Sequence, residues 1–325
     1  MAKPRVSVLV RAYEQERYIA RALDSVLDQQ GVEYELLVGD DGSTDGTRAL
    51  IERYAAAHPG LIRPLLPERN LGHGGRALFA ALLGQARGEY VARLDGDDFW
   101  SSPEKLRRQV DYLDDHPRCA ICFHDVLCHH EDGSRPDYRF TGSRSATEVD
   151  LHELLEGCQI ASIATLFRRD AIHPLPGWYL DMPWDDAPLY VLAAQRGTID
   201  YLPEVMAVYR IHDEGTYRGL PRVRVLELQT GYYERLPVPP EYEPHLRRRL
   251  AHTWVKLGLE RERLGAPDAA RECLAKSLRI EPFRARRLRE RRGERQRLSL
   301  WLLLKAPRRL AHHPRLADWR RRKAA

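Results

Sequence analysis

The order of apolar and polar positions in the first part of the chain alternates between two patterns. Short apolar runs rich in β-branched residues, typical of buried strands, cover residues 6–10, 34–39, 61–65 and 90–94. Between these runs, apolar positions recur at helical spacing in residues 19–29, 47–57 and 76–86. This alternation predicts an α/β fold with a doubly wound sheet. Because ligands of such sheets bind beyond the carboxyl ends of the strands, side chains that follow a strand are the first candidates for a site.

The middle of the chain continues the mixed pattern, and the last part changes to helices. We expect a helix, a strand, a polar loop or hairpin, a short helix and a second strand at residues 103–116, 119–123, 131–149, 151–156 and 160–167. The proline-rich residues 237–240 read as a stiff linker, and the pattern after them is wholly helical. We therefore divide the chain into residues 1–236, a helical region 237–282 and a basic tail 283–325.

The helical region contains six residues at the spacing of one tetratricopeptide-like repeat. They are Trp254, Leu257, Gly258, Ala270, Leu274 and Pro282. One such helix pair cannot bury its own apolar face, since solenoids need about three units. We expect it to pack on the region over residues 1–236 or on a second copy of the chain.

Acidic residues follow two of the predicted strands. Asp95, Asp97 and Asp98 come at the end of the strand over 90–94, and Asp41 follows the strand over 34–39. Carboxylates this close raise one another's pKa unless a cation or several donors hold them ionised. An Mg²⁺-like ion that also carries a phosphate would do this. The alternative is a solvated acidic turn that caps the helix beginning near Pro103.

Charge is distributed unevenly along the chain. Residues 283–325 hold sixteen Lys or Arg against three acidic residues, a net charge of +13; because the whole chain carries +5, residues 1–282 carry −8. Within the tail, the apolar residues 298–305 are too short to span a membrane. Flanking basic residues suit a helix lying on an anionic membrane, and a helix that docks on a second copy or on the protein body fits equally well.

The chain carries no apolar run long enough to cross a membrane, and its start lacks a signal-peptide core. We therefore expect a cytoplasmic protein, with the inner face of the membrane as a further location through the tail. Five scattered cysteines do not suggest a disulfide framework. We expect no nucleic-acid partner.

A cluster of cysteines and histidines between residues 119 and 130 raises the question of a zinc site. Its members are Cys119, Cys122, His124, Cys128, His129 and His130. Residues three apart on an extended strand point to opposite faces, whereas paired zinc ligands usually come from turns. Core cysteines with loop histidines are the favoured interpretation.

Several motifs in a fixed order resemble the GT-A fold, family 2 inverting glycosyltransferases. They are the strand over 6–10 followed by Tyr13, Asp40-Asp41-Gly42 within 38–47, Asn70 with Gly72, residues 88–94 leading to Asp95-Gly96-Asp97-Asp98, Asp185-Asp186 before a helix that ends in Arg196-Gly197, and Tyr209-Arg210 with His212. The resemblance implies a Rossmann-like mixed sheet flanked by helices, to which the all-helical appendage is added.

The resemblance also implies roles for individual residues. It places Ala12, Tyr13, Asp41, Arg76 and Asp95 at the nucleotide, Asp97, Asp95 and His212 at a Mn²⁺ or Mg²⁺ ion, and Asp186 with Asp185 at the catalytic centre. Asp186 would be the general base, since a carboxylate in reach can take the proton of an attacking hydroxyl. The aspartate pair also fits a simple helix cap. His212 would complete the metal shell or contact the diphosphate.

Three positions near the end of the first strand depart from the family pattern. Arg11 and Ala12 stand where Pro-Thr is usual, and Glu14 stands where Asn is common. Arg76 suits a diphosphate, because arginine binds phosphate through two parallel hydrogen bonds, but a solvated arginine at a helix start is as good an interpretation.

The predicted activity is metal-assisted transfer of a sugar from a nucleoside-diphosphate sugar to an acceptor hydroxyl. Asp41 favours uracil or thymine, whose N3–H a carboxylate accepts, and guanine also offers a donor. The acceptor would be a glycan, a lipid-linked molecule or a protein, with a membrane surface or a second copy as further partners. The alternatives are a non-catalytic sugar-nucleotide-binding or scaffold protein and a nucleotidyltransferase.

Overall fold

The computed structural model describes residues 3–142, 147–157, 159–213, 215 and 220–281. Two compact units divide the chain, Met1–Arg218 and Gly219–Ala325. The sequence places the boundary after residue 236, at the end of a helix that the structure groups with the helices that follow it. The tail over 283–325, with its predicted membrane or docking helix, lies outside the described residues.

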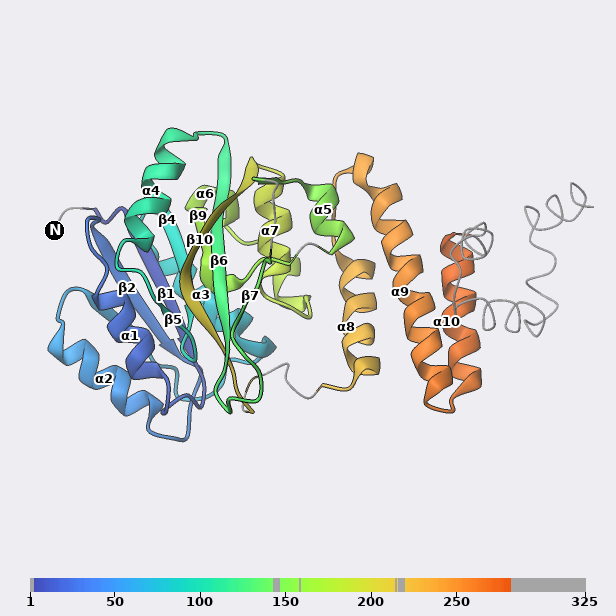
Figure 1. The fold of residues 1–325 in the computed structure, drawn as a ribbon, viewed down its shortest axis with the longest axis horizontal. Coiled ribbons are helices and arrows are strands. Elements are labelled where there is room, and N and C mark those ends of the chain that lie inside the picture. The colour runs from blue at the N-terminus through green and yellow to red at the C-terminus, as the bar shows by residue number, and fades with distance from the viewer. Residues whose placement is uncertain (1–2, 143–146, 158, 214, 216–219, 282–325) are drawn as a thin grey trace, which may run out of the picture. The chain divides into compact units, whose positions relative to one another are not determined.

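The first unit is a mixed β-sheet with helices on both faces (Figure 1). Its strands are β1 (Val6–Ala12), β2 (Tyr34–Asp40), β3 (Ile62–Leu65), β4 (Tyr90–Asp95), β5 (Phe99–Trp100), β6 (Cys119–His130), β7 (Tyr138–Arg139), β8 (Glu148–Val149), β9 (Thr165–Arg168) and β10 (Thr198–Ile211). The order across the sheet is β3-β2-β1-β4-β9-β6-β10-β5, with β7 on β6 and β8 on β10. The strands β3, β2, β1 and β4 are parallel, and β9 runs antiparallel to both of its neighbours.

The helices of this unit occur where the sequence predicts them. They are α1 (Ile19–Leu27), α2 (Thr47–Ala57), α3 (Arg76–Gln85), α4 (Lys105–Asp115), α5 (Leu151–Glu156), α6 (Arg169–Ile172) and α7 (Ala187–Ala194). Side chains on both faces of β1 are buried, since Val8 and Val10 on one face are fully buried and Leu9 on the other is 1% exposed. Burial on both faces explains why the parallel strands appear in the sequence as continuous apolar runs.

Two predicted strands differ from the structure. The strand expected over 160–167 begins only at Thr165, because Ser162–Ala164 is a 3-10 turn closed by a hydrogen bond from the Ala164 N–H to the Ala161 carbonyl (3.0 Å). The strand expected over 119–123 continues to His130. It pairs in parallel with the whole of β10. Its second half is a strand because it hydrogen-bonds to β10, although the polar residues there do not show the apolar pattern of a strand.

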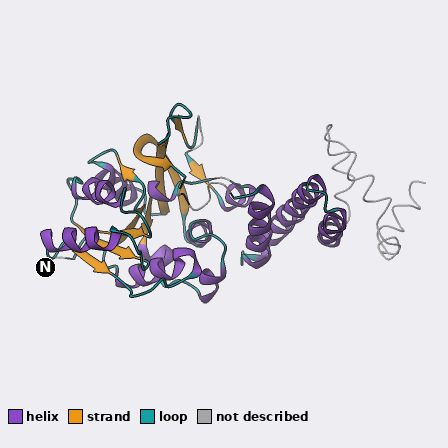
Figure 2. Ribbon diagram, turned by 90° about the horizontal axis from the view of Figure 1, so that it is seen from below, coloured by secondary structure: helices purple, strands orange, loops and turns teal. Residues whose placement is uncertain are grey.

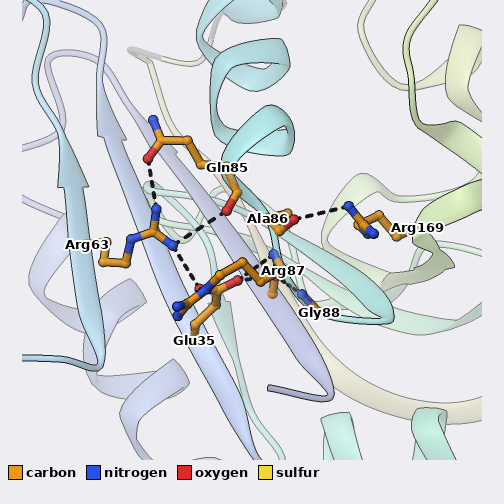
Figure 3. Close-up of polar contacts among 8 residues, drawn as sticks. Glu35, Arg63, Gln85, Ala86, Arg87, Gly88 and Arg169 are labelled. Carbon is orange, nitrogen blue, oxygen red and sulfur yellow. Dashed lines mark hydrogen bonds and ion pairs between the residues drawn. The ribbon is translucent and has the colours of Figure 1, made fainter. Parts of the chain in front are cut away.

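The amino ends of the strands are joined by one buried carboxylate (Figure 3). Glu35 Oε1 accepts hydrogen bonds from the Ser7 hydroxyl and the Arg87 N–H, both at 2.7 Å. Glu35 Oε2 pairs with Arg63 at 3.0 Å and with the Arg87 guanidinium at 2.7 Å. A Cβ at Gly88 would lie 2.5 Å from the Ser7 nitrogen, so the turn before β4 needs glycine to approach this closely. The network ties β1, β2, β3 and the entry to β4 together at the edge opposite the candidate site.

The described part of the second unit is helical (Figure 2). It contains α8 (Arg222–Arg235), α9 (Glu243–Arg263) and α10 (Pro267–Ile280), with a short 3-10 turn before α9. A small apolar core gathers Leu226, Trp254, Leu257 and Cys273. The helices α9 and α10 pack closely as a pair, since a Cβ at Gly258 would lie 3.1 Å from the Ala270 carbonyl oxygen. Across the described residues, none of the helices has the length and apolar character needed to span a membrane.

Candidate active site

The carboxyl ends of β1, β2 and β4 lie side by side, and the predicted site residues that follow them meet there. The register of β1 and β4 sets Arg11 opposite Asp95. The Asp41 N–H donates to the Ala12 carbonyl at 2.9 Å, and the Gly96 N–H donates to the Arg11 carbonyl at 2.8 Å. These bonds join the loops after the three strands, so the nucleotide and acidic motifs share one edge of the sheet.

Asp41 is fixed by the loop that follows β3. Its side chain is buried, and Oδ1 accepts the Leu71 N–H at 2.8 Å. Gly42 has φ +80°, and a Cβ there would lie 2.6 Å from the Asn70 nitrogen, so this approach requires glycine. The Tyr13 side chain is 50% exposed. An oriented carboxylate and an accessible ring, on neighbouring loops, suit the contacts predicted for a nucleotide base.

Glu14 shows how the chain accommodates a departure from the family pattern. Its φ is +53°, a backbone conformation that asparagine adopts more easily than glutamate. The Glu14 N–H donates to Ser43 Oγ at 2.9 Å, and Glu14 Oε1 accepts the Thr44 N–H at 2.7 Å. These two bonds hold Glu14 in place and link the loops after β1 and β2.

Arg76 begins α3 and is tied to a segment far along the chain. Its Nε donates to the Leu180 carbonyl at 3.1 Å, and His73 Nδ1 lies 3.1 Å from the same oxygen. Leu180 belongs to the 3-10 turn Gly177–Asp181. Arg76 therefore anchors this turn, and its contact with a diphosphate stays a prediction.

Asp95 uses both of its carboxylate oxygens within the protein. Oδ1 pairs with Arg11 Nη2 at 2.5 Å, and Oδ2 accepts the Ser162 hydroxyl at 3.0 Å. Ser162 comes from the 3-10 turn before β9. The first aspartate of the acidic loop is thus held from two sides.

The other two aspartates of this loop contact the end of β10. Asp97 Oδ2 lies 3.3 Å from His212 Nε2. Asp98 is buried, and its Oδ1 accepts the backbone N–H of Arg210 at 2.7 Å. The alternative of a solvated turn that caps the helix near Pro103 is therefore wrong for Asp98, because this carboxyl is enclosed and bonded to β10.

Asp185 lies between two arginines. Its Oδ2 is 2.5 Å from Arg11 Nη1, and the same oxygen pairs with Arg93 Nη2. The Phe79 ring lies against both guanidinium groups, with its centroid 5.9 Å from the Arg11 Cζ and 4.7 Å from the Arg93 Cζ. Arg11 therefore bridges Asp95 and Asp185, and it connects the two acidic motifs that lie far apart in the sequence.

Asp186 is the N-cap residue of α7, and its Oδ1 accepts the Ala187 N–H at 2.7 Å. Burial raises the pKa of Asp186, and the negative charge of Asp185 raises it further. Burial opposes ionisation of Asp185 as well, but Arg11 and Arg93 outweigh it and hold the pKa of Asp185 below its ordinary value. Two neighbouring carboxyls whose pKa values are driven apart can divide acid–base work, one staying ionised while the other exchanges a proton.

Asp97 and His212 fit a divalent metal. They present a carboxylate oxygen and an imidazole nitrogen 3.3 Å apart, and His212 is buried with its Nδ1 unpaired among the described residues. Carboxylate and imidazole are both ligands of Mn²⁺, and Mg²⁺ is bound through one or two carboxylates together with phosphate oxygens.

The Cys/His cluster over 119–130 does not form a metal site within the described chain. No three of its side chains converge there. Cys119 Sγ lies 3.0 Å from the Ile121 carbonyl, and Cys122 Sγ lies 3.6 Å from the Gln109 carbonyl. Cys119, Cys122 and Cys128 are buried and free, as the interpretation of core cysteines expects. The expectation of loop histidines is wrong, because the three histidines lie in β6, and His124 and His130 are buried.

Sequence reasoning missed Arg93 and Ser162 and treated Arg11 only as a departure from the family pattern. Arg93 left a signal, since it is a charged residue inside an apolar strand and is only 2% exposed. A buried arginine needs a partner, which points to an acidic residue elsewhere in the chain. Ser162 left none, because its pairing with Asp95 depends on the 3-10 turn before β9.

Comparisons with known proteins agree with this geometry. The family profile described as Glycosyl transferase family 2 matches residues 7–174. An uncharacterized protein of Mycobacterium tuberculosis is 39% identical over 217 residues, which are 66% of this chain and 61% of that protein. The chain thus spans about three fifths of the length of this curated relative.

Two solved structures share the fold. TarS 1-349 of S. aureus, in complex with UDP-GlcNAc, has a TM-score of 0.64 at 19% identity and is covered over 82% of its chain, against 86% of this one. The mannosyltransferase PcManGT of Pyrobaculum calidifontis, in complex with GDP-Man and Mn²⁺, has a TM-score of 0.56 at 20% identity, with 83% of its chain and 98% of this one covered. They confirm the predicted GT-A architecture. The profile match, which covers more than half of the chain, shows that the chain belongs to glycosyl transferase family 2.

Proposed function

We propose that the protein is an inverting glycosyltransferase that moves a sugar from a nucleoside-diphosphate sugar to an acceptor hydroxyl. The observation that carries the proposal is the position of Asp186. It is a buried carboxyl with a raised pKa, next to an Asp185 that two arginines hold ionised, and Arg11 links this pair to the acidic loop at Asp95. A general base beside a nucleotide site is what direct displacement at a sugar carbon requires.

In the proposed reaction, Asp186 takes the proton of the acceptor hydroxyl as its oxygen attacks the anomeric carbon. The nucleoside diphosphate leaves from the opposite face, which inverts the configuration. Asp41 and Tyr13 hold the nucleotide base, and Asp95 contacts the ribose. Asp97 and His212 would hold a Mn²⁺ or Mg²⁺ ion, which supplies neutralisation of the charge that develops on the leaving diphosphate.

For the donor, we infer a uracil or thymine nucleotide, because the Asp41 carboxylate can accept the N3–H of either base. Support from the structural relatives is divided, since one is bound to UDP-GlcNAc and the other to GDP-Man. Guanine also offers an N–H to this carboxylate and stays the alternative. A glycan, a lipid-linked molecule or a protein remains the proposed class of acceptor.

We also propose that α9 and α10 form a single tetratricopeptide-like unit that packs on the catalytic domain or on a second copy of the chain. The close approach at Gly258 and the burial of Trp254 and Leu257 support it. A cytoplasmic location, with the basic tail at the inner face of the membrane, completes the proposal for the whole chain.

The proposal is tested by binding followed by product analysis. We expect UDP or dTDP with Mn²⁺ or Mg²⁺ to raise the melting temperature of the full chain, since a ligand that binds only the folded state stabilises it. The matching sugar nucleotide should then release its nucleoside diphosphate. Release of pyrophosphate from a nucleoside triphosphate and a sugar 1-phosphate would indicate a nucleotidyltransferase instead. Binding without loss of the sugar would indicate a non-catalytic binding protein.

A further inference from the structure

Arg11 occupies a position between two sites that the proposed reaction uses for different purposes. One of its terminal nitrogens pairs with Asp95 and the other with Asp185, each at 2.5 Å. The Arg11 side chain is only 15% exposed, so the two carboxylates rather than water are the main partners of its guanidinium. An arginine with both ends paired in a buried site is fixed in orientation, and it fixes its partners in turn.

Both oxygens of the Asp95 carboxylate have hydrogen-bond donors within the protein. Arg11 engages Oδ1, and the Ser162 hydroxyl donates to Oδ2 at 3.0 Å. Each oxygen of this carboxylate therefore already has a donor. A metal that bound Asp95 would share an oxygen with one of these donors and would approach a fixed guanidinium charge, which opposes cation binding.

Asp97 lies two residues further and is placed differently. Its Oδ2 faces His212 Nε2 at 3.3 Å. His212 is held by its ring contact with Tyr18, whose centroid lies 4.5 Å away, and by the bond from the Arg210 N–H to Asp98 two residues before it. These contacts pre-form a carboxylate–imidazole pair that a divalent metal can enter without breaking an arginine ion pair.

We propose that Arg11 is a positioning residue that keeps Asp95 from the metal, so that Asp97 and His212 supply the protein ligands and Asp95 is reserved for the nucleotide. This inference rests on the proposed function and refines it, because the sequence assigned Asp95 to both the ribose and the metal. Because the Arg11 guanidinium pairs with both Asp95 and Asp185, it also fixes the orientation of Asp95 relative to Asp185, the neighbour of the proposed base.

Binding of Mn²⁺ alone to the full chain tests the inference, measured by the loss of the free-ion electron paramagnetic resonance signal. The proteins compared are the wild type, Arg11→Gln, Asp95→Asn, the double variant and Asp97→Asn. We expect Asp97→Asn to weaken Mn²⁺ binding at least about 10- to 100-fold, because loss of a ligand should cost no less than loss of a residue that only hydrogen-bonds a ligand, for which this range holds. Asp95→Asn in the wild-type background should change it by less than about threefold, because this carboxylate is not a ligand there.

The double variant separates release of Asp95 from simple loss of a repelling charge. If Arg11→Gln frees Asp95 to bind the metal, Asp95→Asn should weaken binding at least about tenfold more in the Arg11→Gln background than in the wild type. Equal effects of Asp95→Asn in the two backgrounds would overturn the inference. So would equal losses from Asp95→Asn and Asp97→Asn, or the absence of Mn²⁺ binding in both the wild type and Arg11→Gln.

Arg21→Gln is the matched control, because it also removes one positive charge. The Arg21 guanidinium, on α1, lies over the Phe99 ring, with its Cζ 3.9 Å from the ring centroid. The effect of Arg21→Gln should be the same with Asp95 or Asn at position 95. The experiment uses no sugar donor, so the metal assignment and the proposed transfer can fail separately. A chain that shows the predicted coupling but never releases a nucleoside diphosphate would refute the proposed function alone.

Discussion

Asp98 accepts the backbone N–H of Arg210 at 2.7 Å, and this bond joins the acidic loop after β4 to the end of β10. The Arg210 guanidinium returns a hydrogen bond to the Asp97 carbonyl at 3.2 Å. Two motifs more than a hundred residues apart are thereby held in register, and the Asp97–His212 pair depends on it. Asp98 therefore positions the Asp97–His212 pair through its hydrogen bond to the β10 backbone.

We expect Asp98→Ala to destabilise the protein by about 1–3 kcal/mol, because it leaves the buried Arg210 N–H without an acceptor. Asp98→Asn keeps an oxygen that can accept this N–H and should cost less. Urea unfolding of both variants measures the difference. Equal losses of stability would mean that this hydrogen bond is not what holds the loop.

The pH profile of the reaction should report the environment of Asp186. Burial and the charge of Asp185 raise the pKa of Asp186, and a general base works only when deprotonated. Turnover should therefore fall as the pH is lowered through this raised pKa, at a pH above the ordinary aspartate value of about 3.9. Measurement of kcat against pH tests this, and an acid limb at or below about pH 4 would count against Asp186 as the base.

Glu35 should make the free energy of unfolding depend on pH in the acid range. Burial alone would raise the pKa of Glu35, but bonds from Ser7 and Arg87 outweigh it and lower the pKa below 4.5. The native state thus favours the ionised form, so the stabilisation is present above the unfolded pKa and is lost as the pH falls through the lower native pKa. Glu35→Gln should cost about 1–3 kcal/mol at pH 7 and make the loss of stability below pH 4.5 less steep in denaturant titrations. An unchanged pH dependence would contradict this role.

Lys105 should also make stability rise with pH, but at higher pH than Glu35, and its buried charge destabilises the fold. It is fully buried, its Nζ donates to Gln109 Oε1 at 2.7 Å, and burial lowers its pKa to about 7. Between this value and the unfolded pKa near 10.5 the unfolded chain binds the extra proton, so stability should rise with pH. Lys105→Met should remove this rise and be neutral or stabilising by up to about 4 kcal/mol at pH 6. A variant that unfolds more readily at every pH would show that the Gln109 bond outweighs the buried charge.

The sequence allowed the sheet edge to be predicted, since the apolar runs before Tyr13, Asp41 and Asp95 are local and their strands are parallel neighbours. Where the outcome depended on long-range pairing, prediction failed. The strand β6 extends to His130 because β10 accompanies it, although its second half is polar. The bridge from Arg11 to Asp185 joins residues from β1 and the start of α7, and no local pattern encodes such a contact.

The claim that Asp186 is the catalytic base is tested most directly by Asp186→Asn, measured for nucleotide binding and for release of UDP from UDP-GlcNAc or GDP from GDP-mannose. Glu204→Gln, which changes an exposed carboxylate paired with Arg108 at 3.4 Å, is the control. We predict a nucleoside-diphosphate Kd within about threefold of the wild type and a rate of release lowered by about 10²- to 10⁴-fold. Release at the wild-type rate from Asp186→Asn would contradict the account.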